Sequence, residues 1–292
     1  MQQLIEKAKV LVEALPYIRR FFGSTMVVKY GGAAIVAEEL RELFAQDIAL
    51  LKFVGIRPVV VHGGGPQIKK VLDQLGIKSH FRDGLRVTDQ QTLEVVEMVL
   101  GGPVNSGIVE LINRHGAKAV GLTGKDGYLI KAKKYMGPDG SSRVDYGLVG
   151  DVEVVNPEVL EAMMDRFVPV IAPLGVGADG TTYNINADTV AGKIAGALKA
   201  VKFVILTDQE GVLGRDGRLQ RSLPESQARR FIEEGVISGG MLPKVECCLK
   251  ALKEGVGKAH IIDGRVEHCL LLEVFTEKGL GTEILPDTAG EN

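Results

Sequence analysis

The sequence has no tryptophan, only three cysteines, and just 5% aromatic residues among its 292 positions. So few aromatic side chains leave little for nucleic-acid bases to stack on, which argues against a single-strand binding platform. Cys247, Cys248 and Cys269 form no CxxC pair, and an odd number of cysteines is typical of a reducing compartment. We therefore expect a cytoplasmic protein with free thiols.

Excess charge of one sign and long apolar runs are missing as well. The 35 basic and 37 acidic residues give a net charge of −2, so any anion site must be local, and neither nucleic acid nor a membrane is an expected partner. Uncharged stretches such as 167–178 are too short to span a membrane, and charges at 6, 7 and 9 interrupt any signal-peptide core. The five histidines lack HxxxH and HExxH spacing, so we expect no metal site built by the protein.

Glycine is abundant: 37 residues, gathered in small clusters after apolar runs. Residues 26–30 form a β-rich run, followed by two glycines and a helical pattern to 54. Residues 59–62 form a second such run, followed by three glycines and a helix at 67–75. Two strand–turn–helix units in tandem predict an α/β fold, a three-layer αβα sandwich around a mainly parallel open sheet.

The remaining pattern extends this plan. We expect a hairpin arm at 80–87, a hairpin excursion at 127–155 and a glycine-rich loop at 174–186. Helices are predicted at 90–114, 187–198 and 242–253, and strands at 119–122, 168–173, 203–207 and 259–262. The predicted division is an N-terminal lobe at 23–175 and a C-terminal lobe at 176–292.

The pattern of residues 1–22 predicts a separate amphipathic helix. Its apolar stripe recurs at steps of four and three residues and consists of Leu4, Ala8, Leu11, Leu15, Ile18 and Phe22. Two interpretations remain open. The helix either packs on its own domain or is an arm that pairs with another subunit.

Two glycine turns are candidate anion sites. Lys29 precedes Gly31 and Gly32 near a strand end, where bare N–H groups and an ammonium can meet an anion. Gly64 and Gly65 lie between a valine-rich strand and a helix N-terminus. The second turn is not a dinucleotide fingerprint, because Ile68 occupies the place of the last glycine, and Gly124-Lys125 is not a P-loop, because it lacks the preceding glycine and the following Ser/Thr. The alternatives are a surface lysine and a plain tight turn.

Two further motifs carry polar groups at helix starts. Asn184, Asn186 and Asp188 alternate before an alanine-rich helix, where capping alone needs one such residue. Gly239, Gly240 and Met241 open a predicted helix that has Lys244 in its first turns, so glycines and a lysine again occur together. Two lysines and helix N-termini around a phosphate suit phosphoryl transfer, in which positioning and charge dominate. Asp188 would then hold the lysines rather than a metal.

Arg86 follows the predicted hairpin arm. An arginine there can hold a carboxylate with two hydrogen bonds, although a solvated surface arginine is an equal alternative from this residue alone.

Five blocks together resemble the acetylglutamate kinases of the amino acid kinase family. They are KYGG at 29–32, HGGG at 62–65, GLRVT at 84–88, NINAD at 184–188 and GGMLPK at 239–244. The match runs in the family's order over residues 26–284. The GLRVT and NINAD blocks are more specific than any single glycine cluster.

The resemblance implies phosphorylation of the γ-carboxylate of N-acetyl-L-glutamate by ATP, with Mg²⁺ carried by the nucleotide, in arginine biosynthesis. By this similarity Lys29 and Lys244 stabilise the transferring group and Asp188 orients them. The residues implied to bind the acyl amino acid are Gly64, Gly65, Arg86, Asn184 and Asn186. Those implied to bind ATP are Gly31, Gly32, Thr207, Asp208, Gly211, Gly239, Gly240 and Met241.

The N-terminal helix resembles the extra helix of the arginine-inhibited members, which links dimers into a hexamer, a trimer of dimers. The resemblance implies an arginine effector in contact with Lys202, His268, Glu273 and Gly279. Two other functions stay open. An acetylaminoadipate kinase would differ by one methylene in its substrate, and a non-catalytic arginine or nucleotide sensor would keep only the fold.

Overall fold

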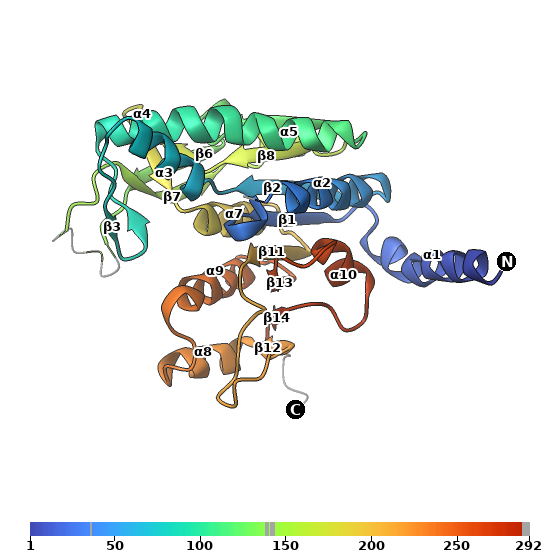
Figure 1. Cartoon of the computed structure of the whole chain (residues 1–292). Coiled ribbons are helices and arrows are strands. Elements are labelled where there is room, and N and C mark those ends of the chain that lie inside the picture. The colour runs from blue at the N-terminus through green and yellow to red at the C-terminus, as the bar shows by residue number, and fades with distance from the viewer. Residues whose placement is uncertain (36, 138–139, 141–143, 288–292) are drawn as a thin grey trace.

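One eight-stranded sheet runs through the computed structural model, which describes residues 1–35, 37–137, 140 and 144–287 (Figure 1). In order across the sheet, its strands are β12 (Ser222–Pro224), β14 (Thr282–Leu285), β13 (Lys258–Asp263), β11 (Lys202–Thr207), β1 (Thr25–Tyr30), β2 (Arg57–His62), β8 (Val168–Ala172) and β5 (Ala119–Thr123). Only the β13–β14 pair is antiparallel among the pairs in this sheet. The predicted, mainly parallel open sheet is confirmed.

Helices cover both faces of the sheet. One layer contains α2 (Glu38–Phe53), α3 (Gly65–Gln74), α4 (Gln90–Val99), α5 (Asn105–Arg114) and α10 (Cys269–Phe275). The other contains α7 (Ala187–Ala197), α8 (Glu225–Glu233) and α9 (Leu242–Lys253).

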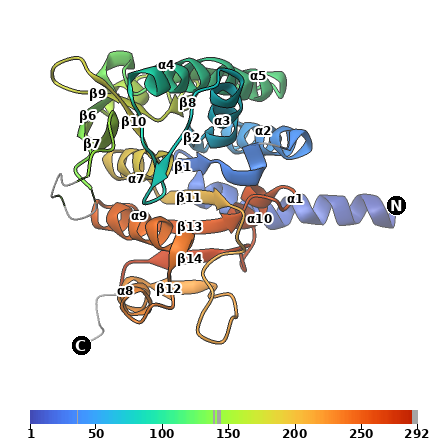
Figure 2. The same ribbon diagram turned by 60° about the vertical axis from the view of Figure 1, so that its left-hand side comes forward.

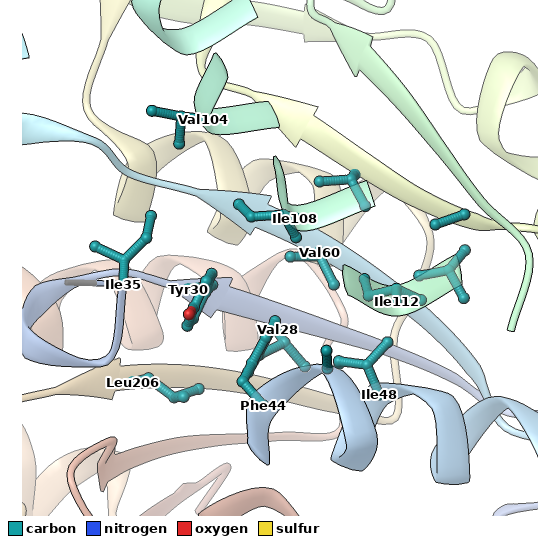
Figure 3. Packing of buried hydrophobic residues seen from close by; sticks show 14 of the residues in the cluster. Val28, Tyr30, Ile35, Phe44, Ile48, Val60, Val104, Ile108, Ile112 and Leu206 are labelled. Carbon is teal, nitrogen blue, oxygen red and sulfur yellow. The ribbon is translucent and has the colours of Figure 1, made fainter. Parts of the chain in front are cut away.

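Alternation along β1 assigns its side chains to these two layers. Val28 and Tyr30 face the first layer, where the Tyr30 ring stacks on Phe44 of α2 with centroids 3.8 Å apart (Figure 3). Val27 packs with Val190 of α7 on the opposite face. Successive strand residues point to opposite faces, so one strand supplies both cores. The three-layer αβα arrangement is therefore confirmed.

The long helix predicted at 90–114 is present but interrupted. A π-helical turn, η2 (Leu100–Val104), separates α4 from α5, and Gly102 within it has φ −101° and ψ −111°. The stretch Gln90–Arg114 is long and apolar enough to cross a membrane by length and composition alone. It packs against α2, α3 and β8 in one layer of the sandwich, as expected of a core helix (Figure 2).

A small closed barrel stands beside the main sheet. It consists of β6 (Ile130–Lys134), β7 (Val149–Val155), β9 (Leu174–Val176) and β10 (Thr182–Ile185). The hairpin arm is confirmed as β3 (Phe81–Arg82) and β4 (Leu85–Arg86). The loop predicted at 174–186 is wrong, because β9 and β10 are short strands held by pairing with β6 and β7. The other short elements are α6 (Glu158–Glu161), η1 (Gly32–Ile35), η3 (Asp126–Tyr128) and η4 (Gly239–Met241).

The N-terminal helix α1 (Gln2–Phe21) extends away from the body of the protein (Figures 1 and 2). Phe21 is buried at its base. In the apolar stripe, Leu11 is 74% exposed and Leu15 51%; the side chains of Leu4 and Ala8 lie outside the described residues. This geometry favours an arm over a helix packed on its own domain.

Candidate active site

The two glycine turns meet at one edge of the sheet. They follow β1 and β2, which are adjacent and parallel, so both turns lie at carboxyl ends, where ligands bind in open α/β sheets. They enclose a cavity of about 160 Å³. Its lining is Lys29, Gly31, Gly32, Ile35, Gly63, Gly64, Gly65, Pro66, Asn186, Ala187 and Asp188.

Lys29 and Asp188 form an ion pair in this cavity. Lys29 Nζ lies 3.0 Å from Asp188 Oδ1, and both side chains are largely buried. The start of α7 positions Asp188, because Asn186 Oδ1 accepts hydrogen bonds from the amides of Asp188 and Thr189. Asn186 is thus the helix cap, and Asp188 faces the lysine. The NINAD block therefore supplies both a cap for α7 and a partner for Lys29.

A second cavity of about 180 Å³ adjoins the first and shares its glycine turn. It is lined by Gly63, Gly64, Gly65, Ile68, Phe81, Gly84, Leu85, Arg86, Leu100, Val149, Pro173, Asn184, Ile185, Asn186 and Ala187. The hairpin, the π turn, the small barrel and α3 therefore all contribute walls. All five predicted acyl-substrate residues lie in this lining.

Arg86 is built into this cavity rather than solvated. It is only 7% exposed, and its guanidinium donates hydrogen bonds to Gly65 O, at 3.2 Å, and to Ser79 Oγ. Its charge also lies over the Phe81 ring, 4.6 Å from the centroid. Burial lowers the pKa of Arg86 from its usual value, but guanidinium remains charged at neutral pH. A carboxylate entering the cavity would meet a fixed cation.

The predicted nucleotide residues are brought together only in part. Thr207 ends β11, the neighbour of β1, and a Cβ on Gly32 would lie 3.9 Å from Thr207 Cα and from the amide of Asp208. Gly211 packs against Thr282, whose hydroxyl would be 2.6 Å from an added Cβ, so this glycine serves the fold.

Lys244 and the turn before it stand outside both cavities. Lys244 Nζ donates to Gly240 O at 3.1 Å on the first turn of α9, and Gly239 and Gly240 are exposed. Among the ion pairs of the described residues, Asp188 pairs with Lys29 and not with Lys244.

A larger cavity, about 950 Å³, lies between the base of α1 and α10. Lys202, Glu273 and Gly279 line it, together with Arg20 and Phe21 of α1. Burial acts to raise the pKa of Glu273, but the hydrogen bond with His260, at 2.7 Å, and the nearby charges bring it to about 2. The cavity therefore contains a permanent carboxylate.

His268 does not line this cavity. Its Nδ1 lies 2.6 Å from the buried carboxylate of Asp47 on α2. His260, on β13, is the histidine that the cavity presents. Sequence reasoning missed it, although a histidine inside the apolar run at 259–262 was the available signal.

Residues 24–263 match the amino acid kinase family. An acetylglutamate kinase of Heliobacterium modesticaldum is 58% identical over 98% of this chain and 100% of its own, and one of Syntrophobacter fumaroxidans is 55% identical over 99% of both. The chain belongs to the acetylglutamate kinases of the amino acid kinase family.

Solved structures show the same fold. The N-acetylglutamate synthase of Neisseria gonorrhoeae, complexed with coenzyme A and N-acetyl-glutamate, has a TM-score of 0.85 at 28% identity; the match covers 96% of this chain and 64% of the synthase. Carbamate kinase of Giardia lamblia shares the fold, with a TM-score of 0.63 at 16% identity over 91% of this chain and 99% of its own.

Proposed function

We propose that the protein transfers the γ-phosphoryl group of ATP to the γ-carboxylate of N-acetyl-L-glutamate, giving N-acetyl-L-glutamyl 5-phosphate in the second step of arginine biosynthesis. The observation that carries the proposal is the pair of adjoining cavities. One is built for an anion beside Lys29, the other for a carboxylate beside Arg86, and both use Gly63, Gly64 and Gly65.

The mechanism needs no covalent enzyme intermediate. The γ-carboxylate of the acceptor, which Arg86 and Asn184 hold in the second cavity, attacks the γ-phosphorus in line and ADP leaves. Lys29 and the amides of the glycine turns stabilise charge on the equatorial oxygens, and Asp188 holds Lys29. Lys244 joins them from α9. Mg²⁺ carried by the nucleotide phosphates would neutralise part of their charge.

Hydroxamate formation tests the function. Purified protein, MgATP and hydroxylamine are combined with N-acetylglutamate, glutamate or N-acetylaminoadipate, since hydroxylamine traps an acyl phosphate. We expect hydroxamate from N-acetylglutamate. Product mainly from N-acetylaminoadipate would reassign the enzyme to that substrate, and no product from any acceptor would favour a sensor.

Arg86→Ala should raise the KM for the acyl amino acid by roughly tenfold or more, because a charge-assisted hydrogen bond to a carboxylate contributes ~1.5–3 kcal/mol. Steady-state kinetics with varied acceptor measure this, and Arg82→Ala on the exposed strand of the same hairpin is the control. An unchanged KM would mean that Arg86 does not hold the substrate.

We also propose that L-arginine inhibits the enzyme by binding the 950 Å³ cavity, where Lys202 and Glu273 offer charges for a carboxylate and a guanidinium. A second N-acetylglutamate synthase structure, complexed with L-arginine, resembles this chain with a TM-score of 0.80 at 26% identity. In this arrangement Gly279 lies beside Glu273, and His268 would act from outside the cavity.

Glu273→Gln should raise the arginine concentration for half-inhibition about tenfold or more, because a buried charged partner of the guanidinium is lost. Glu267→Gln, exposed and outside the cavity, is the control. Equal inhibition of the two variants would exclude Glu273 from effector binding.

We propose that α1 pairs with α1 of another subunit and builds a hexamer, a trimer of dimers, in the cytoplasm. Residues 1–22 would be the oligomerisation segment, 23–175 the acceptor lobe and 176–292 the nucleotide and effector lobe. Deleting residues 1–22 should reduce the sedimenting species to a dimer, because the exposed apolar stripe is removed. Sedimentation velocity decides this. An assembly of unchanged subunit number would contradict the pairing of α1.

A further inference from the structure

His62 is buried immediately before the glycine turn of the proposed active site, and the mechanism above gives it no role. It is the last residue of β2 and has no exposed surface. Its Nδ1 lies 2.9 Å from Gly63 O, and its Nε2 lies 3.0 Å from Asn105 Nδ2. Both ring nitrogens therefore have a defined partner.

Asn105 determines which ring nitrogen carries the proton. Its Nδ2 also lies 2.9 Å from Val170 O and 3.4 Å from Leu122 O, and two carbonyl acceptors identify this atom as the amide nitrogen. An amide nitrogen only donates, and its two protons match its two nearest partners, Val170 O and His62 Nε2, so His62 Nε2 accepts. The proton is then on Nδ1, which donates to Gly63 O.

The ring keeps this form at neutral pH. Burial lowers the pKa of His62 to about 4, and the hydrogen bond to Gly63 opposes that shift only in part. A neutral ring has one donor and one acceptor, which are the two roles that Gly63 O and Asn105 Nδ2 require.

The hydrogen bond from His62 constrains the orientation of the peptide that joins Gly63 to Gly64. Gly63 N donates to Tyr30 O at 2.8 Å, and Gly63 O accepts from His62, so both backbone groups of Gly63 are fixed. In a planar trans peptide the next N–H points away from that carbonyl. The Gly64 amide is thereby directed away from His62, and Gly64 itself lines both cavities.

The π turn in the long helix places two side chains against the glycine turn that follows β2. Asn105 is the first residue after the π turn, and Leu100, its first residue, lies so close to Gly64 that a Cβ there would be 2.5 Å from Leu100 Cδ2. Gly121 leaves room for the other end of the amide, since a Cβ there would be 1.9 Å from Asn105 Oδ1. Such turns occur frequently at functional sites.

We propose that His62 and Asn105 are positioning residues that fix the Gly63–Gly64 peptide, so that the Gly64 amide donates to the transferring phosphoryl group. The inference rests on the proposed kinase function. It predicts that the buried pair contributes to stabilising the transition state and not to binding the substrate.

Two substitutions of His62 separate its two hydrogen bonds. In His62→Asn, the side-chain amide occupies the position of Nδ1 and can still donate to Gly63 O. In His62→Gln, the amide reaches the position of Nε2 and keeps only the contact with Asn105. Both variants remove the ring from the core, so thermal unfolding of each shows what that removal costs.

We expect kcat for hydroxamate formation to fall ~10²-fold in His62→Gln, the scale of losing one backbone donor to the transition state, and less than about tenfold in His62→Asn. The KM for the acceptor should change little in either variant. Equal kcat losses in the two variants, or a loss that follows the folded fraction, would overturn the inference. Wild-type protein without activity on any acceptor would instead overturn the proposed function.

The proton position has its own test. In ¹⁵N-histidine-labelled wild-type protein, the His62 resonances, assigned by their loss in His62→Asn, should show the Nδ1–H tautomer without titration between pH 5.5 and 8.5. An Nε2–H tautomer would overturn the inference whether or not the enzyme is active.

Discussion

In the variant Lys29→Met, kcat for hydroxamate formation should fall by ~10²–10³-fold, the cost of losing one preorganised electrostatic stabiliser. Methionine keeps most of the length and the apolar stem of the side chain but removes its charge. Lys29 lies in the smaller cavity, paired with Asp188 at 3.0 Å and shielded from water, where a charge acts more strongly than at the surface. Steady-state kinetics with saturating MgATP and acceptor measure the change.

The control for Lys29 is Lys69→Met. Lys69 is exposed on α3 and pairs with Asp73 one turn away, so removing its charge should leave kcat unchanged. The alternative role for Lys29 is binding ATP equally in the ground and transition states. That role predicts a higher KM for ATP with kcat intact, and this result would contradict the assignment.

Lys244→Ala is the second large effect, with an expected fall in kcat of ~10²-fold. In the structure its amine donates to Gly240 O, outside both cavities, so the lysine must exchange this carbonyl for the phosphoryl oxygens when substrates bind. The hydrogen bond to Gly240 O is replaceable by water. We therefore expect the thermal midpoint to change little while kcat falls.

Lys250→Ala is the matched control, since Lys250 is exposed on the same helix, α9. Kinetics and thermal unfolding are measured on both variants. If kcat of Lys244→Ala stays within about threefold of that of Lys250→Ala, Lys244 takes no part in the transition state. Lys29 would then be the only lysine that stabilises the transferring phosphoryl group in the proposed mechanism.

Local pattern was enough to predict the units that build the site. Each glycine turn directly follows an apolar strand, so the sheet edge shared by Lys29 and Gly64 follows from parallel pairing alone. The cap at Asn186 and the hairpin that carries Arg86 also depend on neighbours in sequence.

Features that depend on distant pairing were not predictable. The strands β9 and β10 are three and four residues long and exist only because β6 and β7 close a barrel with them. His62, Asn105 and Val170 meet only in the folded protein, from three separate elements. In the sequence, the π turn is marked only by Gly101, Gly102 and Pro103, and these residues are equally typical of an ordinary break in a helix.

The pairing of β1 with β11 has a mechanical consequence. Residues from Met26 to Lys29 are in register with those from Lys202 to Ile205, so the two halves of the chain are joined through a continuous backbone ladder rather than a linker. A hinge between them would have to break that ladder. A movement that carried Lys244 toward the phosphoryl group, as the proposed mechanism requires, would instead be absorbed as a change in the twist of the sheet and in the loops at its carboxyl edge. The sheet would then deform as one unit, and its stiffness would limit how far the two halves could separate during a turnover.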